Sequence, residues 1–352
     1  MEEEPKSRAI EYIKDPAAVA KKIHVPTYDE ILERIKSRYP RRGRTLFERE
    51  MARLQATYDI LMSKTDFIRD LVRLVDGLHP FYWKLIEIDF DRPRIHQSIK
   101  CVSRARKLAS NLYEKYRVLL MASENRRELI KVGSEGRGRI LSTVKKCRRS
   151  LEYLRDLVVF IQHLPSIDAS LPTIIVAGAP STGKSTFVRN VSRAQTKIAS
   201  YPFTTTNIHI GHVVLERSEG RRVKIQVIDT PGLLDRPFEE MNPIERRAVA
   251  ALEEIEGAIL FLVDVSGDAY MSVERQYRLL SQIINNYSKN KKIFIGINKI
   301  DISDEILLDK ALEKGRAYVR SGAVEEILLL VSRDPESARG AVAKIAQKLG
   351  LL

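Results

Sequence analysis

The sequence of 352 residues contains only two cysteines, only six histidines and no long apolar run. Cys101 and Cys147 form no CxxC pair, so we expect neither a disulfide framework nor a zinc site. No apolar run approaches the ~18 residues that a membrane-spanning helix needs, and the N-terminus lacks the apolar core of a secretion signal. These absences argue against a membrane protein and against a disulfide-stapled secreted domain. They predict a soluble, cytoplasmic protein.

The histidines include one pair at a spacing that could hold a metal. His209 and His212 are three residues apart, which suits metal binding on a helix. The surrounding sequence NIHIGHVVL predicts a strand instead, and in a strand positions three apart point to opposite faces. We therefore expect no metal site at this pair.

Acidic residues are scarce in one part of the chain. Overall, 60 Lys and Arg outnumber 46 Asp and Glu, which gives a net charge of +14. The stretch 101–150 alone contains 14 basic and 4 acidic residues. Such an excess favours a polyanionic partner, with nucleic acid first. The alternative is a solvated helix face, which would carry mixed signs.

The first half of the chain has helical periodicity and almost no strand signal. Thr27, with Glu30 three residues later, has the pattern of a helix N-cap. Stretches at 45–78, 93–122 and 138–164 repeat apolar residues at spacings of three and four. Long helices with short joints predict an antiparallel bundle, so we assign residues 1–164 to a basic, all-α domain. The segment PSIDASLP, residues 165–172, is the predicted linker.

From Thr173 onwards, short β-branched runs alternate with helical segments. Candidate strands lie at 173–178, 223–229, 258–265, 292–298 and 325–332. They lack polar alternation, which is typical of strands that are buried on both faces of a parallel sheet. Residues 207–229 predict a hairpin, with a turn at Gly220, that adds one antiparallel strand. We therefore predict an α/β domain over 173–352 with a mostly parallel sheet.

The segment GAPSTGKS lies between the first predicted strand and the next helix, where a phosphate-binding loop belongs. Gly178 and Gly183 let the backbone curl, so that successive N–H groups and the helix N-terminus face phosphate oxygens. Lys184 would reach the β and γ phosphates, and the Ser185 hydroxyl would bind Mg²⁺. The predicted phosphate-binding residues are Gly178, Ala179, Pro180, Ser181, Thr182, Gly183, Lys184, Ser185 and Thr186.

A second segment, VIDTPG, supplies the carboxylate that a nucleotide-bound metal requires. Asp229 would hold a metal-bound water, and the N–H of Gly232 would sense the γ phosphate. Thr230 and Pro231, between them, join the predicted nucleotide-binding residues. In the preceding segment, one threonine of the run 204–206 would close over Mg²⁺ while the γ phosphate is present.

A third segment, GINKID, predicts which base is bound. A carboxylate at Asp301 would accept two hydrogen bonds from the N1–H and the exocyclic amine of guanine, a donor pair that adenine lacks. Lys299 would cover the base plane, and Asn298 would tie this loop to the phosphate loop. Ser332 and Arg333, after the last predicted strand, are the candidates for a backbone N–H contact to the guanine carbonyl. The predicted ligand is GTP or GDP, and not ATP.

The segments GAPSTGKST, YPFTTTNIHIGHV, DTPGLLDRP and NKID, preceded by a long helical region, resemble the nucleolar GTP-binding protein 1 family of Obg-related GTPases. The resemblance covers the chain from about Pro5 to Ser332. It implies a phosphate-loop GTPase domain behind a helical domain, with Mg²⁺ as cofactor. It also implies work on the large ribosomal subunit or its precursor through ribosomal RNA, and a nucleolar location in a eukaryote. We expect no contact with membranes or DNA.

Matched residue by residue, the resemblance assigns roles in hydrolysis. Thr205 becomes the magnesium threonine, so the metal site consists of Ser185, Thr205 and, through water, Asp229. Lys184, Thr205 and Gly232 become the catalytic residues.

Three departures from the common pattern affect these roles. Leu233 stands where many GTPases carry a water-orienting glutamine, so we expect slow intrinsic hydrolysis. Ser181 replaces an asparagine that can help to bind an activating potassium ion in related proteins. Longer relatives continue beyond the position of Leu352, so contacts of their tails do not carry over.

Three functions remain open at this stage. The first is a GTP-gated assembly factor that docks on ribosomal RNA through the basic stretch 101–150. The second is a regulatory GTPase whose helical domain binds a protein. The third is an RNA-binding scaffold that binds GTP without turnover.

Overall fold

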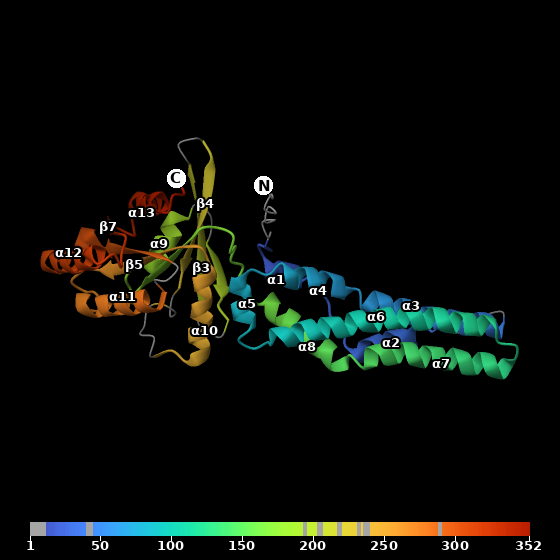
Figure 1. Cartoon of the computed structure of the whole chain (residues 1–352). Helices are drawn as coiled ribbons and strands as arrows, with labels where there is room; N and C mark the ends of the chain where they lie inside the picture. Colours follow the sequence, from blue (N-terminus) through green and yellow to red (C-terminus); the bar gives the residue numbers. More distant parts are fainter. Residues whose placement is uncertain are drawn as a thin grey trace, which may run out of the picture. The chain divides into compact units, whose positions relative to one another are not determined.

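The structure, a computed structural model, describes residues 12–39, 45–192, 196–202, 207–216, 220–230, 234, 240–287 and 291–352. The chain divides into two compact units (Figure 1). The first, the helical unit, comprises Met1–Leu78 and Asp89–His163, and the second, the α/β unit, comprises His79–Ile88 and Leu164–Leu352. None of the described helices is both long and apolar enough to cross a membrane.

Several helices of the helical unit begin with a side-chain cap. Thr27, Thr45 and Asn125 each accept a hydrogen bond from the backbone N–H three residues later. The cap predicted at Thr27 is thereby confirmed, and such caps satisfy N–H groups that the first helical turn leaves without partners. The described helices are α1 (Pro16–Ala20), α2 (Tyr28–Ser37), α3 (Leu46–Lys64), α4 (Phe67–Asp76), α6 (Arg92–Met121), α7 (Arg126–Lys145) and α8 (Arg148–Gln162).

The long helices form the predicted bundle. Helix α6 packs along α7, and α3 packs against both (Figure 1). Only residues 122–125 join α6 to α7, so the two helices are antiparallel neighbours. Their shared core is apolar and includes Leu54, Val102, Leu120, Ile140 and Val144, all at most 1% exposed.

A disulfide bond joins Cys101 to Cys147, which corrects the expectation of no disulfide. Cys101 lies on α6, and Cys147 precedes α8 at a break in what the sequence predicts as one continuous helix over 138–164. The two Cα atoms are 5.9 Å apart, although 46 positions separate them in the sequence. The antiparallel return of α7 along α6 brings these positions together, and no spacing rule for cysteines encodes that return.

The α/β unit contains a seven-stranded sheet of order β2-β3-β4-β1-β5-β6-β7. Strand β3 runs antiparallel to both its neighbours, and the other pairs are parallel, which confirms the predicted sheet. Strand β2 was not predicted, because it is a short strand at the edge of the sheet. The strands are β1 (Thr173–Gly178), β2 (Lys197–Ser200), β3 (Asn207–Glu216), β4 (Arg222–Asp229), β5 (Gly257–Asp264), β6 (Lys292–Asn298) and β7 (Glu326–Leu330).

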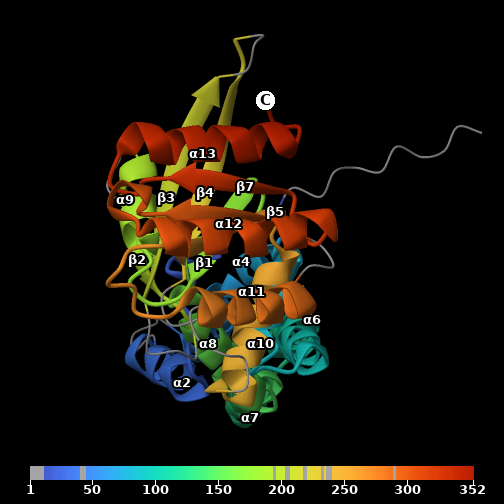
Figure 2. The ribbon, with the colours of Figure 1, turned by 90° about the vertical axis from the view of Figure 1, so that its left-hand side faces the viewer.

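Helices cover both faces of this sheet (Figure 2). Helices α9 (Lys184–Val191) and α13 (Pro335–Lys348) pack on one face, around Ile174, Val176 and Leu260. Helices α11 (Val273–Tyr287) and α12 (Glu305–Arg320) contact the central and outer strands from the other side. The remaining helices of the unit are α5 (Pro80–Ile86), α10 (Pro243–Ala251), η2 (Leu252–Glu254) and η3 (Ile300–Ile302).

Helix α5 lies within the range 1–164 that the sequence predicts as the helical domain, but it packs with the α/β unit. The Tyr82 hydroxyl donates to the backbone carbonyls of Pro165 and Ile167, at 3.1 and 2.5 Å. Lys84 forms an ion pair with Glu254 at 2.6 Å. These partners are far away in the sequence, so periodicity alone does not reveal them.

Candidate nucleotide-binding site

The phosphate loop predicted at Gly178–Ser185 connects β1 to α9. Gly183 is the N-cap of α9 and has a φ of 94°, in the left-handed region that favours glycine. A Cβ atom at this position would lie 2.5 Å from the side-chain nitrogen of Asn298. Glycine is therefore required both by the turn and by the close approach of the loop after β6. The N-terminus of α9 follows directly, and the N–H groups of a first helical turn point towards the same place.

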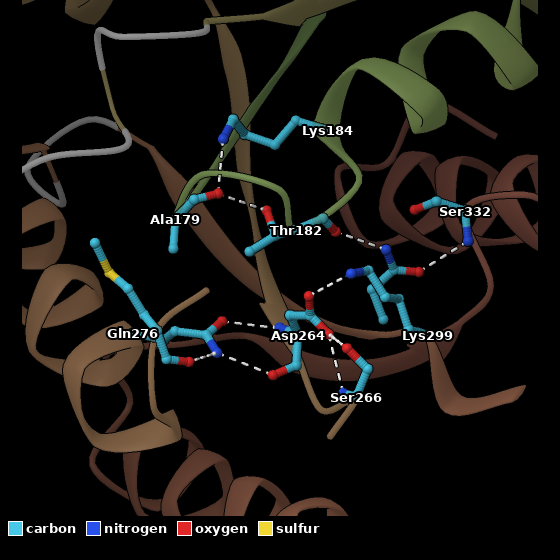
Figure 3. Close-up of polar contacts among 10 residues, drawn as sticks. Ala179, Thr182, Lys184, Asp264, Ser266, Gln276, Lys299 and Ser332 are labelled. Carbon is cyan, nitrogen blue, oxygen red and sulfur yellow. Dashed lines mark hydrogen bonds and ion pairs between the residues drawn. The ribbon is translucent and has the colours of Figure 1, made fainter. Parts of the chain in front are cut away.

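The Lys184 side chain folds back over this loop. It is 6% exposed, and its ammonium donates to the carbonyl oxygens of Gly178 and Ala179, both at 2.8 Å. Figure 3 shows the contact with Ala179. The Thr182 hydroxyl donates to Ala179 at 2.9 Å and closes the turn. The loop thus holds one positive charge at its centre, where it can attract a polyphosphate.

The predicted metal ligands that the structure describes lie side by side. The Ser185 hydroxyl donates to Asp229 Oδ2 at 2.5 Å, and Asp229 is fully buried at the end of β4. A hydroxyl and a carboxylate are the oxygen donors that Mg²⁺ prefers, so these residues fit the metal of a Mg²⁺–nucleotide complex. The remaining predicted metal ligand, Thr205, lies outside the described residues, as do Pro231, Gly232 and Leu233.

One histidine, His209, lies closer to Asp229 than the sequence suggested. His209 pairs with Asp229 in the β3–β4 register, and its Nδ1 lies 3.6 Å from Asp229 Oδ2. His212 lies elsewhere on β3, where burial, with nearby Lys224 and Lys197, lowers its pKa. Within the described residues, no group of three or more His, Cys, Asp or Glu could hold a metal. His209 and His212 both lie on the strand that the sequence predicted for them.

Asn298 joins three loops through its side-chain amide. Its nitrogen donates to the carbonyl of Thr182 at 2.7 Å, and its oxygen accepts from the N–H of Ser332 at 2.8 Å. The predicted tie between the base loop and the phosphate loop is confirmed. The N–H of Ser332, which the sequence offered with Arg333 as a donor to guanine, donates to Asn298 in this structure. Arg333 is exposed, and the Ser332 hydroxyl is buried with no hydrogen-bond partner among the described residues.

A buried carboxylate positions the Lys299 side chain. Lys299 has a φ of 65°, and its ammonium lies 2.5 Å from Asp264 Oδ2, at the end of β5 (Figure 3). Asp264 is 1% exposed, and its Oδ1 accepts from the N–H and the hydroxyl of Ser266, at 2.9 and 2.6 Å. The Gln276 amide brackets the backbone of Asp264, accepting from its N–H at 2.8 Å and donating to its carbonyl at 2.9 Å. No motif in the sequence points to Asp264, Ser266 or Gln276.

These loops enclose a pocket of about 150 Å³. The residues that line it include Gly183, Lys299, Asp301, Ser332 and Arg333. The structure therefore brings the predicted base-binding residues together beside the phosphate loop. An aliphatic lysine stem next to an exposed carboxylate can hold a flat base with a pair of N–H donors at its edge.

Comparisons with known proteins identify the two parts of the chain separately. Residues 21–168 match a family described as the NOG1 N-terminal helical domain. Residues 173–299 match a family described as 50S ribosome-binding GTPase. The two matches follow one another in the chain and meet near the end of the predicted linker.

Several individual relatives are named nucleolar GTP-binding protein 1. The chain is 32% identical to nucleolar GTP-binding protein 1 of Caenorhabditis elegans over 329 residues, which cover 88% of this chain and 47% of the relative. It is 30% identical to the protein of that name from Arabidopsis thaliana, over 88% of this chain and 48% of the relative. A solved structure of a nucleolar GTP-binding protein 1 from Plasmodium falciparum is 32% identical, with a TM-score of 0.42, over 53% of this chain and 90% of that one. The chain spans about half the length of the curated relatives it matches.

Proposed function

The chain belongs to the nucleolar GTP-binding protein 1 family, and from this premise we propose that it is a GTP-gated assembly factor for the large ribosomal subunit. It contains the family's helical N-terminal domain followed by a GTPase domain. In the proposed cycle, the GTP-bound protein docks on ribosomal RNA, and hydrolysis releases it. Its location would be nucleolar in a eukaryote and cytoplasmic otherwise.

One observation carries the assignment of the nucleotide. The Asn298 amide connects the phosphate loop, the base loop and the loop after β7 around a single pocket. Asp301 in that pocket would accept both donors of a guanine edge, whereas adenine would leave the carboxylate unsatisfied. Ser332 and Arg333 would complete the pocket on the opposite side, through the hydroxyl of Ser332 and the backbone of Arg333.

Hydrolysis would proceed by in-line attack of water on the γ phosphate. Lys184, released from the carbonyls of Gly178 and Ala179, would neutralise charge on the β and γ phosphates. Ser185, Thr205 and, through water, Asp229 would hold Mg²⁺, which supplies further charge stabilisation when bound. Leu233 cannot orient the attacking water, so the intrinsic rate would be slow. We assign no general base.

The segments that contain Thr205 and Gly232 would respond to whether GTP or GDP is bound. Thr205 would close over Mg²⁺ and Gly232 would contact the γ phosphate, so that both segments order with GTP and release with GDP. Ser181, at a φ of 63°, stands where potassium-dependent relatives carry asparagine. Ser181 lacks the amide with which that asparagine would help to bind potassium.

The docking function would belong to the helical unit, whose stretch 101–150 has ten more basic than acidic residues. Ribosomal RNA is the partner that this charge favours. The alternative is a regulatory GTPase whose helical unit binds a protein. A protein-binding bundle would show little RNA affinity at any salt concentration, whereas RNA phosphate contacts would weaken steeply as salt rises.

Sedimentation with large ribosomal subunits or their precursors tests the switch. The protein should co-sediment with a non-hydrolysable GTP analogue and dissociate with GDP. Lys184→Ala should lose nucleotide affinity, and with it the difference between the two nucleotides. Equal binding of the unaltered protein in both nucleotide states would remove the proposed switch. A single-turnover assay with the same particles would show whether the chain hydrolyses GTP or serves as a scaffold without turnover.

A further inference from the structure

Many of the basic side chains of the helical unit are already neutralised by an acid. Arg106 pairs with Asp66, Arg137 with Glu50, and Arg139 with Glu135. Arg117 pairs with Glu114, and Arg148 with Asp29 and Glu152. These five arginines hold the bundle or its surface together and leave little charge for a partner. Arg106, Arg137 and Arg148 pair with acids outside 101–150, so the excess of ten basic residues counted for that stretch overstates the charge that a ligand could meet.

A different set of cations lines a groove on α6. The groove, here called the α6 groove, has a volume of about 650 Å³. It follows one stripe of α6 from Pro93 to Leu108 and faces the end of α7 from Thr143 to Cys147. Lys100, Arg104 and Lys146 are exposed side chains of its lining, and the described residues include no ion-pair partner for any of them.

The floor of the α6 groove is apolar and cross-linked. Cys101 and Cys147, with Ala105 and Leu108, contribute to it. Leu108 is 49% exposed, so part of its side chain is open to a ligand. Each half of the disulfide is next in sequence to a groove cation, Lys100 on one side and Lys146 on the other. The bond therefore fixes how far apart the two backbones that carry these charges can lie.

We propose that the α6 groove is the docking site for an RNA strand, with Lys100, Arg104 and Lys146 each contacting a backbone phosphate. This inference rests on the proposed docking of the helical unit on RNA and names its residues. Lys100 and Arg104 are one helical turn apart, roughly 6 Å along the axis, a spacing of the order of that between neighbouring phosphates in a strand. The apolar floor can pack against ribose.

Charge favours RNA over an acidic peptide as the occupant. The lining of the groove contains no Asp or Glu, so the charges that line it are positive. An RNA strand carries a negative charge at every phosphate, so it can pair with cations along the whole groove. An acidic peptide helix that packed leucines against the groove could present carboxylates from only one of its faces. The four glutamates of 101–150 lie at 114–135, near the opposite end of the α6–α7 hairpin.

A charge-matched pair of triple variants tests the inference in the full chain. The groove variant carries Lys100→Gln, Arg104→Gln and Lys146→Gln. The control variant carries Lys115→Gln, Arg127→Gln and Lys131→Gln, which remove the same charge from exposed positions near the other end of the hairpin. Fluorescence anisotropy with a 20-nucleotide single-stranded RNA and with an RNA hairpin would be measured over a range of salt concentrations. A glutamate-rich peptide would be the third probe.

For the groove variant we expect RNA affinity at least tenfold below that of the unaltered protein. The slope of log affinity against log salt should become shallower by about 2 to 3, as expected for three lost phosphate contacts. The control variant should keep most of that slope. Circular dichroism and GDP affinity should not change in either variant, which excludes misfolding as the cause.

Other outcomes overturn the inference in distinguishable ways. Equal losses in both variants would mean that charge matters but the groove does not, and the proposed RNA docking would survive. Binding of the peptide, sensitive to the groove variant, without binding of RNA would assign the groove to a protein. No RNA binding by the unaltered protein would remove the RNA docking of the proposed function together with this inference.

Discussion

At the scale of single residues, a few buried polar groups hold the base-binding loop in place. Asp264 is the clearest, because one carboxylate anchors Lys299 through one oxygen and Ser266 through the other. It would not touch a nucleotide itself. Its effect on binding would come from the position it gives to Lys299, whose stem lines the pocket.

Asp264→Asn should therefore weaken guanine nucleotide binding. The amide keeps the shape of the carboxylate but leaves the Lys299 ammonium without its counter-charge. Lys299 is 24% exposed, so water would compensate in part, and we expect a loss of about 1–2 kcal/mol, roughly five- to thirtyfold in the Kd for GDP by calorimetry. Ser266→Ala, which removes one hydrogen bond and no charge, should cost less. An unchanged Kd in Asp264→Asn would show that Lys299 needs no anchor.

Asp301→Asn should change which base is preferred. An amide at this position can donate to the oxygen that xanthine carries where guanine has its amine, so preference should move from GTP towards xanthosine triphosphate. Calorimetry with both nucleotides on the variant and the unaltered chain would measure this. Retention of full GTP preference in the variant would contradict the assignment of Asp301 to the base edge.

The motif residues of the site were predictable, but their supports were not. A phosphate loop and an NKxD segment have fixed spacing because the backbone must curl around phosphate and a carboxylate must face the base. Asp264, Gln276 and His209 follow no such rule, since their roles depend on strand register and on side-chain rotamers. The hydrogen bond from the N–H of Ser332 to Asn298 also depends on tertiary geometry, so the sequence could not predict it.

At the scale of elements, periodicity predicted the bundle helices and the buried strands well. Strands such as β1 and β5 are apolar along their length because helices cover both faces, and that signal is strong. The edge strand β2 lacks it, with Ile198 65% exposed, and so it was missed. The disulfide was missed because cysteine spacing reports motifs and not the antiparallel return of one helix along another.

The disulfide should stabilise the helical unit. A cross-link between positions 46 apart restricts the unfolded chain, and such a bond contributes roughly 2–4 kcal/mol. Urea unfolding with and without reductant, followed by circular dichroism, would measure this. The variant Cys101→Ser/Cys147→Ser should unfold like the reduced protein and should no longer respond to reductant. If reductant has no effect on the unaltered protein, the bond is not formed in solution.

At the scale of the whole molecule, each unit has its own apolar core. The helical unit buries residues of α3, α6, α7 and α8, and the α/β unit buries both faces of its sheet. The change from helical to alternating patterns along the sequence predicted this division. The assignment of α5 could not be predicted, because the carbonyls that Tyr82 contacts lie more than eighty positions away.

Separate cores predict separate responses to ligand and to reductant. We expect GDP with Mg²⁺ to bind only the folded α/β unit, so at a hundredfold excess over its Kd it should stabilise that unit by about 2.7 kcal/mol. Reductant should destabilise only the helical unit. In calorimetric unfolding of the full chain, we therefore expect two transitions, one moved up by nucleotide and the other moved down by reductant. The Lys184→Ala variant should lose the first shift and keep the second. A single transition that responds to both agents would mean that the two cores unfold as one, and that nucleotide binding is coupled energetically to the helical unit.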